Sequence, residues 1–399
     1  MRLRLVLILL ALAAAACSGG ETSVGGDAGR SGDAAPPAVT VPQLEQSPVE
    51  EVPSALDSID QDDLPTPLIE RSDLRDGGPP PDGIPPIDEP TFHRAGDVDF
   101  LDDDEPVLAV DVDGETRAYP VQVMIWHEIV NDTFGDVPVT VTYCPLCNTA
   151  VGFERRLDDG RVLSFGTSGK LFRSSLVMYD RQTESLWAHF DGSALAGVLT
   201  GTELDRIPVQ TVSWSDWLAQ NPDGLVLSRD TGASRDYGRN PYPGYDDINE
   251  DPFLFDGELD GRLPAKERVV GLGLDSRPTA VRLDPLLEEG VITTELGGRP
   301  VVVWALPGTA SALDSSSVDG GRDVGATGVF ISEHDRQPLT FTRTASGFTD
   351  EETASTWTVF GLAVAGPLEG VQLELLEHVD TFWFAWAAFS PDTRVLPGV

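Results

Sequence analysis

The sequence repeats part of itself 162 positions further along the chain. Residues 105–113 (EPVLAVDVD) align with residues 267–275 (ERVVGLGLD), with apolar residues and the final Asp at matching places. Two further pairs of segments align at nearly the same spacing: 138–141 with 300–303, and 180–187 with 350–357. The repetition predicts an internally duplicated unit, with copies over about residues 105–229 and 267–395. We therefore expect a fold in which two halves of similar structure follow one another along the chain.

The local patterns inside the first copy predict short strands and very few helices. Runs of apolar and β-branched residues at 107–112 and 137–143 are typical of strands, and Asp113-Gly114 is typical of a hairpin turn. A short helix is expected over 121–130, after Pro120, and another over 214–220. The second copy repeats this order. We therefore expect a β-rich α+β fold.

The first 17 residues have the pattern of a bacterial lipoprotein signal peptide. Arg2 and Arg4 precede an apolar stretch over 5–12, and small residues then lead to Cys17. The pattern predicts cleavage before Cys17 and lipidation of that cysteine. The protein would then be anchored on the outer face of the membrane, in the cell envelope. The alternative is an ordinary cleaved signal in which the cysteine is incidental.

Composition divides the remainder of the chain. Residues 18–90 are rich in Pro, Gly and Asp and lack a sustained hydrophobic period, so we expect a mostly disordered tether. Residues 91–262 would form the first domain, and 263–399 a degenerate second copy. The formal net charge of −39 argues against nucleic acid as a partner, because phosphate backbones are bound mainly by Lys and Arg. The membrane, reached through Cys17, is the only partner that the sequence indicates.

Only two cysteines remain once the signal region is set aside, and this excludes a disulfide scaffold. They form the motif Cys-Pro-Leu-Cys at Cys144 and Cys147, followed by Asn148, which tolerates the left-handed turn that such motifs often need. Two histidines, His127 and His189, belong to the same copy. In the second copy these four Cys and His positions are occupied by Leu306, Thr309, Glu289 and Val359.

The joint loss of these four residues from one copy predicts that they serve one function in the other. Two thiolates need further ligands to complete a tetrahedral metal site, and histidine is the usual partner. We therefore expect zinc or copper to be bound by Cys144, Cys147, His127 and His189. Met124 and Met178 could supply thioether sulfur to a copper site, although buried methionines usually serve packing.

Two other interpretations of the cysteine pair remain open. In a thiol-disulfide protein, Cys144 would be the exposed attacking thiol and His127 or His189 would tune it. Residues 151–155 alternate as in a strand, however, whereas redox-active pairs of this kind usually begin a helix. The third possibility is a non-catalytic envelope module whose second copy binds a partner. Whether the protein is an enzyme is left open.

Three segments of the first copy resemble domain-of-unknown-function family 3179, whose members are extracytoplasmic proteins of bacteria and archaea. The segments are 126–132 (WHEIVND), 143–150 (YCPLCNTA) and 179–187 (YDRQTESLW). Asn148 stands where Gly is common in the family, and Asn can adopt the same backbone conformation. The resemblance covers roughly residues 90–260. It implies a domain assignment and an extracytoplasmic location, and no particular activity.

Overall fold

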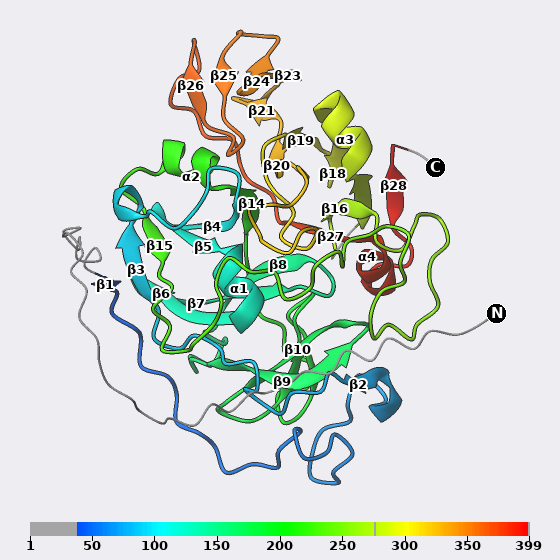
Figure 1. Ribbon diagram of the computed structural model, residues 1–399. Coiled ribbons are helices and arrows are strands. Elements are labelled where there is room, and N and C mark those ends of the chain that lie inside the picture. The colour runs from blue at the N-terminus through cyan, green and yellow to red at the C-terminus, as the bar shows by residue number, and fades with distance from the viewer. Residues whose placement is uncertain (1–37, 275–276, 398–399) are drawn as a thin grey trace, which may run out of the picture. The chain divides into compact units, whose positions relative to one another are not determined.

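Seven β-sheets and four short α-helices make up the part of the chain that the structure describes (Figure 1). The structure is a computed structural model, and it describes residues 38–274 and 277–397. The predicted β-rich α+β class is confirmed. The signal peptide expected over residues 1–17 and Cys17 lie outside the described residues.

Three of the sheets are built mainly from the first copy. The six-stranded sheet has the order β1 (Val39–Thr40), β3 (Thr91–Arg94), β15 (Leu225–Leu227), β5 (Glu115–Pro120), β4 (Pro106–Val112), β14 (Gln210–Ser213). The five-stranded sheet has the order β12 (Ala194–Ala196), β11 (Leu186–Ala188), β10 (Ser175–Asp180), β9 (Phe165–Phe172), β2 (Leu74–Asp76). The third sheet has the order β13 (Arg206–Ile207), β8 (Thr149–Glu154), β7 (Val137–Cys144), β6 (Ile129–Phe134).

The second copy supplies the other four sheets. One has the order β27 (His378–Phe382), β16 (Arg268–Leu272), β17 (Thr279–Arg282), β28 (Arg394–Leu396). A three-stranded sheet has the order β18 (Val291–Leu296), β19 (Arg299–Leu306), β20 (Ala326–Ile331). The remaining two contain β23 (Phe341–Thr344), β24 (Gly347–Asp350), β25 (Thr356–Trp357) and β26 (Ala363–Ala365), and the pair β21 (Glu333–His334) with β22 (Gln337–Pro338).

The order of the strands recurs between the halves. The series β14-β4-β5-β15 of the first half corresponds to β27-β16-β17-β28 of the second, and in both the last pair is parallel. The hairpin β6-β7-β8 corresponds to β18-β19-β20 in the same way. This agreement is what a duplicated sequence would produce. The duplication itself stays a prediction.

The four helices are one or two turns long. They span Val121–His127 (α1), Trp214–Gln220 (α2), Leu283–Glu289 (α3) and Trp383–Phe389 (α4), and two 3-10 turns lie at Arg71–Asp73 and Ala95–Asp97. The expected helix over 214–220 has the predicted bounds. The helix expected over 121–130 ends three residues early, because Glu128 adopts a positive φ and the residues after it pair as β6. None of the described helices is long and apolar enough to cross a membrane.

The two halves share their hydrophobic cores. One cluster of buried side chains joins Val107 and Trp214 of the first half to Trp304 and Trp357 of the second, and a larger one also draws on both halves. Strand β27 packs on β8, and β14 packs on β20, so each half contributes one strand to the other's surroundings. The boundary predicted between residues 262 and 263 therefore does not separate two cores.

Residues 38–90 lie along the strands of the first half, which corrects the expected tether over this part of the chain. β1 pairs with β3, and β2 pairs with the edge strand β9. Ala55, Ile59 and Ile87 are buried. These few apolar anchors and backbone hydrogen bonds hold the segment without an α-helix or a long strand, so the sequence shows no periodic signal. Residues 18–37, the rest of the expected tether, lie outside the described residues.

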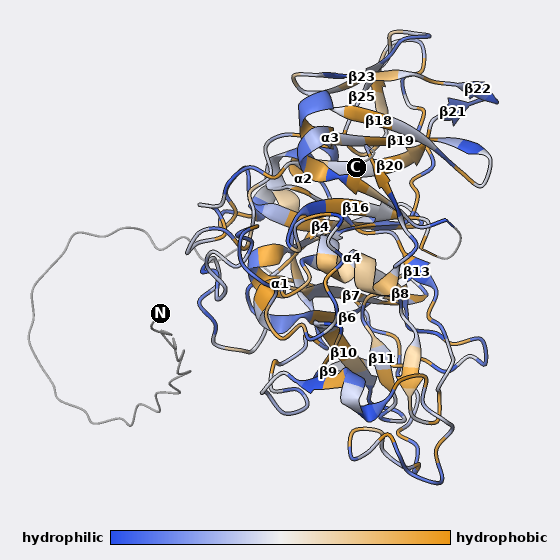
Figure 2. Cartoon of the chain, turned by 90° about the vertical axis from the view of Figure 1, so that its right-hand side faces the viewer, coloured by the Kyte–Doolittle hydropathy of each residue, from blue (hydrophilic) through white to orange (hydrophobic). Residues whose placement is uncertain are grey.

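Hydrophobic residues are concentrated on strands such as β10, and many of the connecting loops are hydrophilic (Figure 2). The tryptophans that recur in both copies are buried: Trp187, Trp214 and Trp217 are at most 3% exposed. Each copy also carries one hairpin in which an Asp side chain accepts a hydrogen bond from a buried tryptophan. The pairs are Asp180 with Trp187 and Asp350 with Trp357, both at 2.9 Å.

Candidate functional site

The Cys-Pro-Leu-Cys motif forms the turn between β7 and β8. Cys144 is the last residue of β7, and Asn148 precedes β8 with a φ of 52°, which confirms the predicted left-handed position. The Asn148 N–H donates to the Pro145 carbonyl at 3.3 Å, as in a tight turn. Both cysteines are free thiols and are buried, Cys144 being 2% exposed and Cys147 fully buried. The expectation that Cys144 is exposed is therefore wrong.

The two thiols have different surroundings. Burial raises the pKa of the Cys144 thiol well above its usual value. Burial acts in the same direction on Cys147, but hydrogen bonds with Cys144, Thr149 and Ser175 outweigh it, and the pKa of Cys147 is lowered. The Cys147 Sγ lies 3.6 Å from the Ser175 Oγ and 3.8 Å from the Cys144 carbonyl oxygen. Cys147 is thus the thiol that ionises more readily.

His189 belongs to the same cluster. It follows β11 directly and is fully buried, and its Nδ1 lies 3.4 Å from the Ser175 Oγ, which is also the neighbour of Cys147. Its other ring nitrogen, Nε2, has no hydrogen-bond partner. Burial lowers the pKa of His189 to about 4, and the nearby Cys144 acts in the opposite direction. The imidazole is therefore neutral at ordinary pH and can offer a lone pair.

Both ring nitrogens of His127 are hydrogen-bonded to groups other than the cysteine pair. Its Nδ1 lies 2.6 Å from the Pro85 carbonyl oxygen and its Nε2 lies 2.6 Å from the Tyr237 hydroxyl. Because a carbonyl can only accept, Nδ1 carries the proton and Nε2 accepts from Tyr237. Burial lowers the pKa of His127. With both nitrogens used in this way, His127 fits a structural role, and the sequence-based grouping of four ligands is not assembled.

The predicted ligands do not form a ready-made metal centre. Across residues 38–274 and 277–397, no group of three or more Cys, His, Asp and Glu side chains is already positioned to hold an ion. Met124 and Met178 are fully buried within the larger hydrophobic cluster, as packing residues would be. The pair Cys144 and Cys147 with His189 is the part of the predicted set that the fold brings together.

Sequence reasoning missed Glu128, which lies beside the cysteine pair. It follows α1 with a φ of 60°, is 8% exposed, and interacts electrostatically with Cys144. Burial, with the nearby Cys144, raises its pKa well above the usual value. Comparing the copies one position beyond His127 would have found it, because Gly290 occupies the matching place in the second copy.

The motif is held from the outside by residues of the second half and of the connection between the halves. The Thr381 hydroxyl and the Phe382 N–H both donate to the Cys147 carbonyl, at 3.0 and 3.1 Å. Tyr245 donates its hydroxyl to the Leu146 carbonyl at 3.0 Å. The turn that carries the two thiols is therefore fixed by backbone contacts that the first half alone does not supply.

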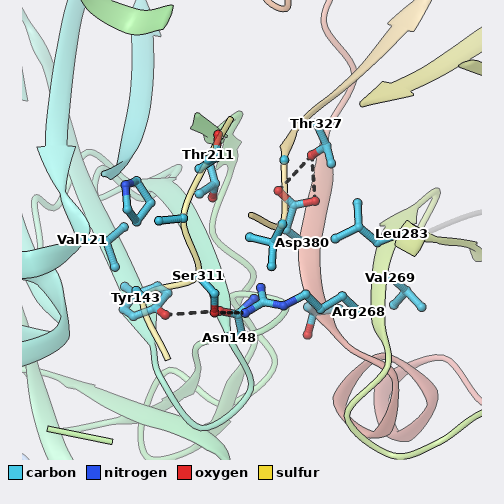
Figure 3. A pocket seen from close by; sticks show the side chains of 17 residues that line it. Val121, Tyr143, Asn148, Thr211, Arg268, Val269, Leu283, Ser311, Thr327 and Asp380 are labelled. Atoms are coloured by element: carbon cyan, nitrogen blue, oxygen red, sulfur yellow. Dashed lines mark hydrogen bonds between the residues drawn. The ribbon is translucent and has the colours of Figure 1, made fainter. Parts of the chain in front are cut away.

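A small cavity lies where the halves meet, next to the motif (Figure 3). Tyr143 and Asn148 line it from the first half, while Arg268, Asp380 and Thr327 line it from the second. Arg268 extends across it to donate to Ser311 at 2.7 Å. The cavity volume of about 40 Å³ has room for a few water molecules.

The sequence matches the profile of a family described as "Protein of unknown function (DUF3179)" over residues 81–393. This range includes almost all of both copies, whereas the motifs alone had indicated residues 90–260. No curated protein and no solved structure matches the sequence significantly. The family resemblance that the motifs predicted is confirmed, and the chain belongs to the DUF3179 family.

Proposed function

We propose that this protein is an extracytoplasmic, lipid-anchored metal-binding protein whose site contains Cys144, Cys147 and His189. The ion would be zinc or copper, because thiolate and imidazole ligands suit both. His127, with both ring nitrogens hydrogen-bonded, is left out of the ligand set. The proposal concerns metal binding alone and includes no chemical reaction at the site.

The observation that carries the proposal is the unpartnered Nε2 of His189. A buried polar atom without a partner costs about 1–3 kcal/mol, so native proteins rarely leave one. This nitrogen is fully buried and belongs to the same cluster as two buried free thiols. A bound cation would satisfy the nitrogen and would also offset the cost of burying thiolate charge.

The surroundings of the three residues support the same proposal. Metal-binding histidines usually donate their second N–H to an oxygen, which fixes the ring and the tautomer. The Ser175 Oγ is in place for that role at the His189 Nδ1, and Thr381 and Phe382 fix the turn through the Cys147 carbonyl. These contacts would hold the ligands in place while an ion binds.

The proposed location rests on the N-terminal sequence. Residues 1–17 carry the pattern of a lipoprotein signal ending at Cys17, and outside the cytoplasm an unprotected pair of cysteines tends to oxidise. A bound ion would protect the thiols there. Mass spectrometry of membrane-extracted protein tests the anchor: a lipidated N-terminal cysteine is expected, and an unmodified N-terminus at another residue would contradict it.

Metal content tests the binding function. Protein prepared under reducing conditions and without chelators should contain about one zinc or copper ion per chain by elemental analysis. Cys144→Ser, Cys147→Ser and His189→Gln should each reduce this content strongly, and His127→Gln should retain it. If the folded, fully reduced wild-type protein binds neither zinc nor copper, the proposal is wrong.

A second candidate function is supported by the unequal thiols. Cys147 has the lowered pKa and hydrogen-bonds with Cys144, as in a dithiol that attacks through one sulfur. The attacking thiol would then be Cys147 and not Cys144. Oxidation by diamide should give a reversible intramolecular disulfide, two hydrogen atoms lighter, and the reduced protein should reduce insulin. Retention of both free thiols under diamide would exclude this candidate.

A further inference from the structure

We propose that a larger cavity, separate from the cysteine site, binds a neutral sugar. It lies between the two halves and has a volume of about 350 Å³, within the range of small-molecule sites. The first half lines it with residues of β4, β5, β14 and α2, and the second half with the segments around Phe360 and Gln372. The inference does not depend on metal binding. It is carried by the hydrogen-bonding groups that the lining residues have left for a ligand.

Four side-chain amides line this cavity, those of Gln210, Gln220, Asn221 and Gln372. Asp111 is the only charged residue in the lining. The described residues that line the cavity thus include no Lys or Arg, the side chains that usually bind a phosphate or a carboxylate. The lining therefore favours an uncharged ligand with several polar groups.

Backbone carbonyls fix the orientation of the Gln372 amide. Its Nε2 donates to the carbonyls of Phe360 and Leu373, at 2.7 and 3.1 Å. A carbonyl can only accept, so the amide nitrogen must face these two groups. No described residue donates to the Gln372 Oε1, and the side chain is exposed. Gln372 therefore has an acceptor left for a ligand.

Asn221 and Gln210 are oriented in the same way. The Asn221 Nδ2 donates to the Trp217 carbonyl at 3.1 Å, and the Gln210 Nε2 donates to the Thr327 carbonyl at 3.3 Å. Within the described part of the chain, no donor reaches the oxygen of either amide. With the carboxylate of Asp111, the lining residues thus offer acceptors on four side chains.

Gln220 supplies a donor to complement these acceptors. The Thr358 hydroxyl of the second half donates to its Oε1 at 2.8 Å, so its Nε2 is left for a ligand. Thr116 adds a hydroxyl, which can donate or accept. A lining with several acceptors and few donors matches a ligand with several hydroxyl groups, because each hydroxyl can donate one hydrogen bond and accept others.

Phe360 and Trp217 give the cavity an aromatic side. Phe360 is partly exposed, whereas Trp217 is 1% exposed and stacks on Trp214, with ring centroids 5.7 Å apart. An aromatic face packs against the C–H groups of a sugar ring, while the hydroxyls at the ring edge form hydrogen bonds. Aromatic and acceptor groups in one lining therefore favour a sugar ring over a small flexible polyol such as glycerol.

The second half has a matching cavity that lacks part of this set. Its volume is about 310 Å³, and it is lined by β16, β27 and Trp386. Strand β14 pairs with β4 in the same register as β27 pairs with β16. This register places Val379 at the position of Gln210, and Gly273 at the position of Asp111. Two acceptors of the first cavity are therefore replaced in the second, as the cysteines are.

Calorimetric titration of the purified protein tests the inference. The probes are glucose, mannose, N-acetylglucosamine, maltose and cellobiose, with glucose 6-phosphate as the charged comparison and glycerol as the flexible one. Phe360→Ala removes the aromatic face, and Thr116→Val removes a hydroxyl while keeping the shape. Gln220→Glu keeps the acceptor for Thr358 and removes the donor. Gln337→Ala, on the exposed strand β22, is the control.

We expect at least one neutral sugar to bind with a dissociation constant of about 1 mM or below. Glucose 6-phosphate should bind at least about tenfold more weakly than glucose, because Asp111 repels it and the lining provides no cation. Each of the three cavity variants should weaken sugar binding about tenfold, and Gln337→Ala should bind as wild type does. Thr116→Val should also melt at the wild-type temperature, which separates lost binding from lost folding.

Three results would overturn the proposal. The first is that none of the neutral sugars binds at concentrations up to about 10 mM. The second is that glycerol or glucose 6-phosphate binds as tightly as the sugars. The third is sugar binding that all three cavity variants leave unchanged, because the sugar would then lie elsewhere. None of these results bears on the metal site, which metal content tests separately.

Discussion

At the scale of single residues, Glu105 couples the stability of the protein to pH. The residue is 4% exposed, and its Oε2 accepts a hydrogen bond from the Gln122 Nε2 at 2.6 Å. Burial raises its pKa from 4.5 to about 7, against the smaller opposing effects of Asp102 and Gln122. The folded protein therefore binds a proton here between pH 4.5 and 7 that the unfolded chain has released.

The first prediction is that Glu105 makes the protein less stable as the pH rises, because the folded protein holds this proton more tightly than the unfolded chain does. The contribution of Glu105 to stability is complete below pH 4.5 and is lost as the pH rises through 7, and it amounts to at most about 3 kcal/mol. Glu105→Gln should remove this dependence, so that its free energy of unfolding falls less than that of wild type over this range. Urea unfolding at several pH values measures the difference. The exposed Glu203→Gln is the control, and identical pH profiles for wild type and Glu105→Gln would contradict the prediction.

At the scale of elements, two hairpins use the same internal hydrogen bonds. Asp180 accepts from the Thr183 N–H at 2.7 Å and from Trp187, and Asp350 accepts from the Thr353 N–H at 2.6 Å and from Trp357. All the acceptors are carboxylate oxygens inside a tight turn. Each Asp therefore fixes a turn and satisfies the indole of a buried tryptophan at once.

The second prediction concerns these two aspartates. Asp180→Asn and Asp350→Asn should each lower the free energy of unfolding by about 1.5–3 kcal/mol, because a charged acceptor is lost and one amide N–H is turned toward donors. The effects should add in the double variant, since the hairpins are separate elements. Chemical denaturation followed by tryptophan fluorescence measures them. The exposed turn residue Asp158→Asn should change stability by less than about 0.5 kcal/mol.

The elements also show how far the sequence alone can lead. Local chemistry predicts α2 and the left-handed Asn148, because capping and turn residues act within a few positions. The end of α1 could not be found in this way, since Glu128 occupies a conformation that its own preferences disfavour. The choice of His189 over His127 depends on which side chains the folded chain places beside each ring, and residue spacing does not contain that information.

At the scale of the whole molecule, the second half completes the first. Thr381 and Phe382 hold the Cys147 carbonyl, and the buried clusters cross between the halves. The third prediction is that a chain ending at residue 262 does not fold cooperatively, because it exposes these apolar surfaces to water. A broad urea transition and dye binding to exposed apolar surface are the expected results.

Fragment complementation provides the control for this prediction. Adding a separately produced chain of residues 263–399 should restore a sharp transition, because the missing surfaces then return by association. A first half that unfolds alone with the midpoint and steepness of the full chain would show that the shared clusters contribute little. The second half would then be dispensable for the cysteine turn.

The burial of both thiols has a kinetic consequence. A reagent such as iodoacetamide reacts with Cys144 or Cys147 only in molecules that have opened locally, because neither sulfur is accessible in the closed form. When reclosing is faster than alkylation, the ratio of the observed rate to that of a free cysteine peptide equals the equilibrium constant of opening. The two cysteines therefore report how often the structure opens around the turn that β27 and Tyr245 contact, and their alkylation rates give the free energy of that opening.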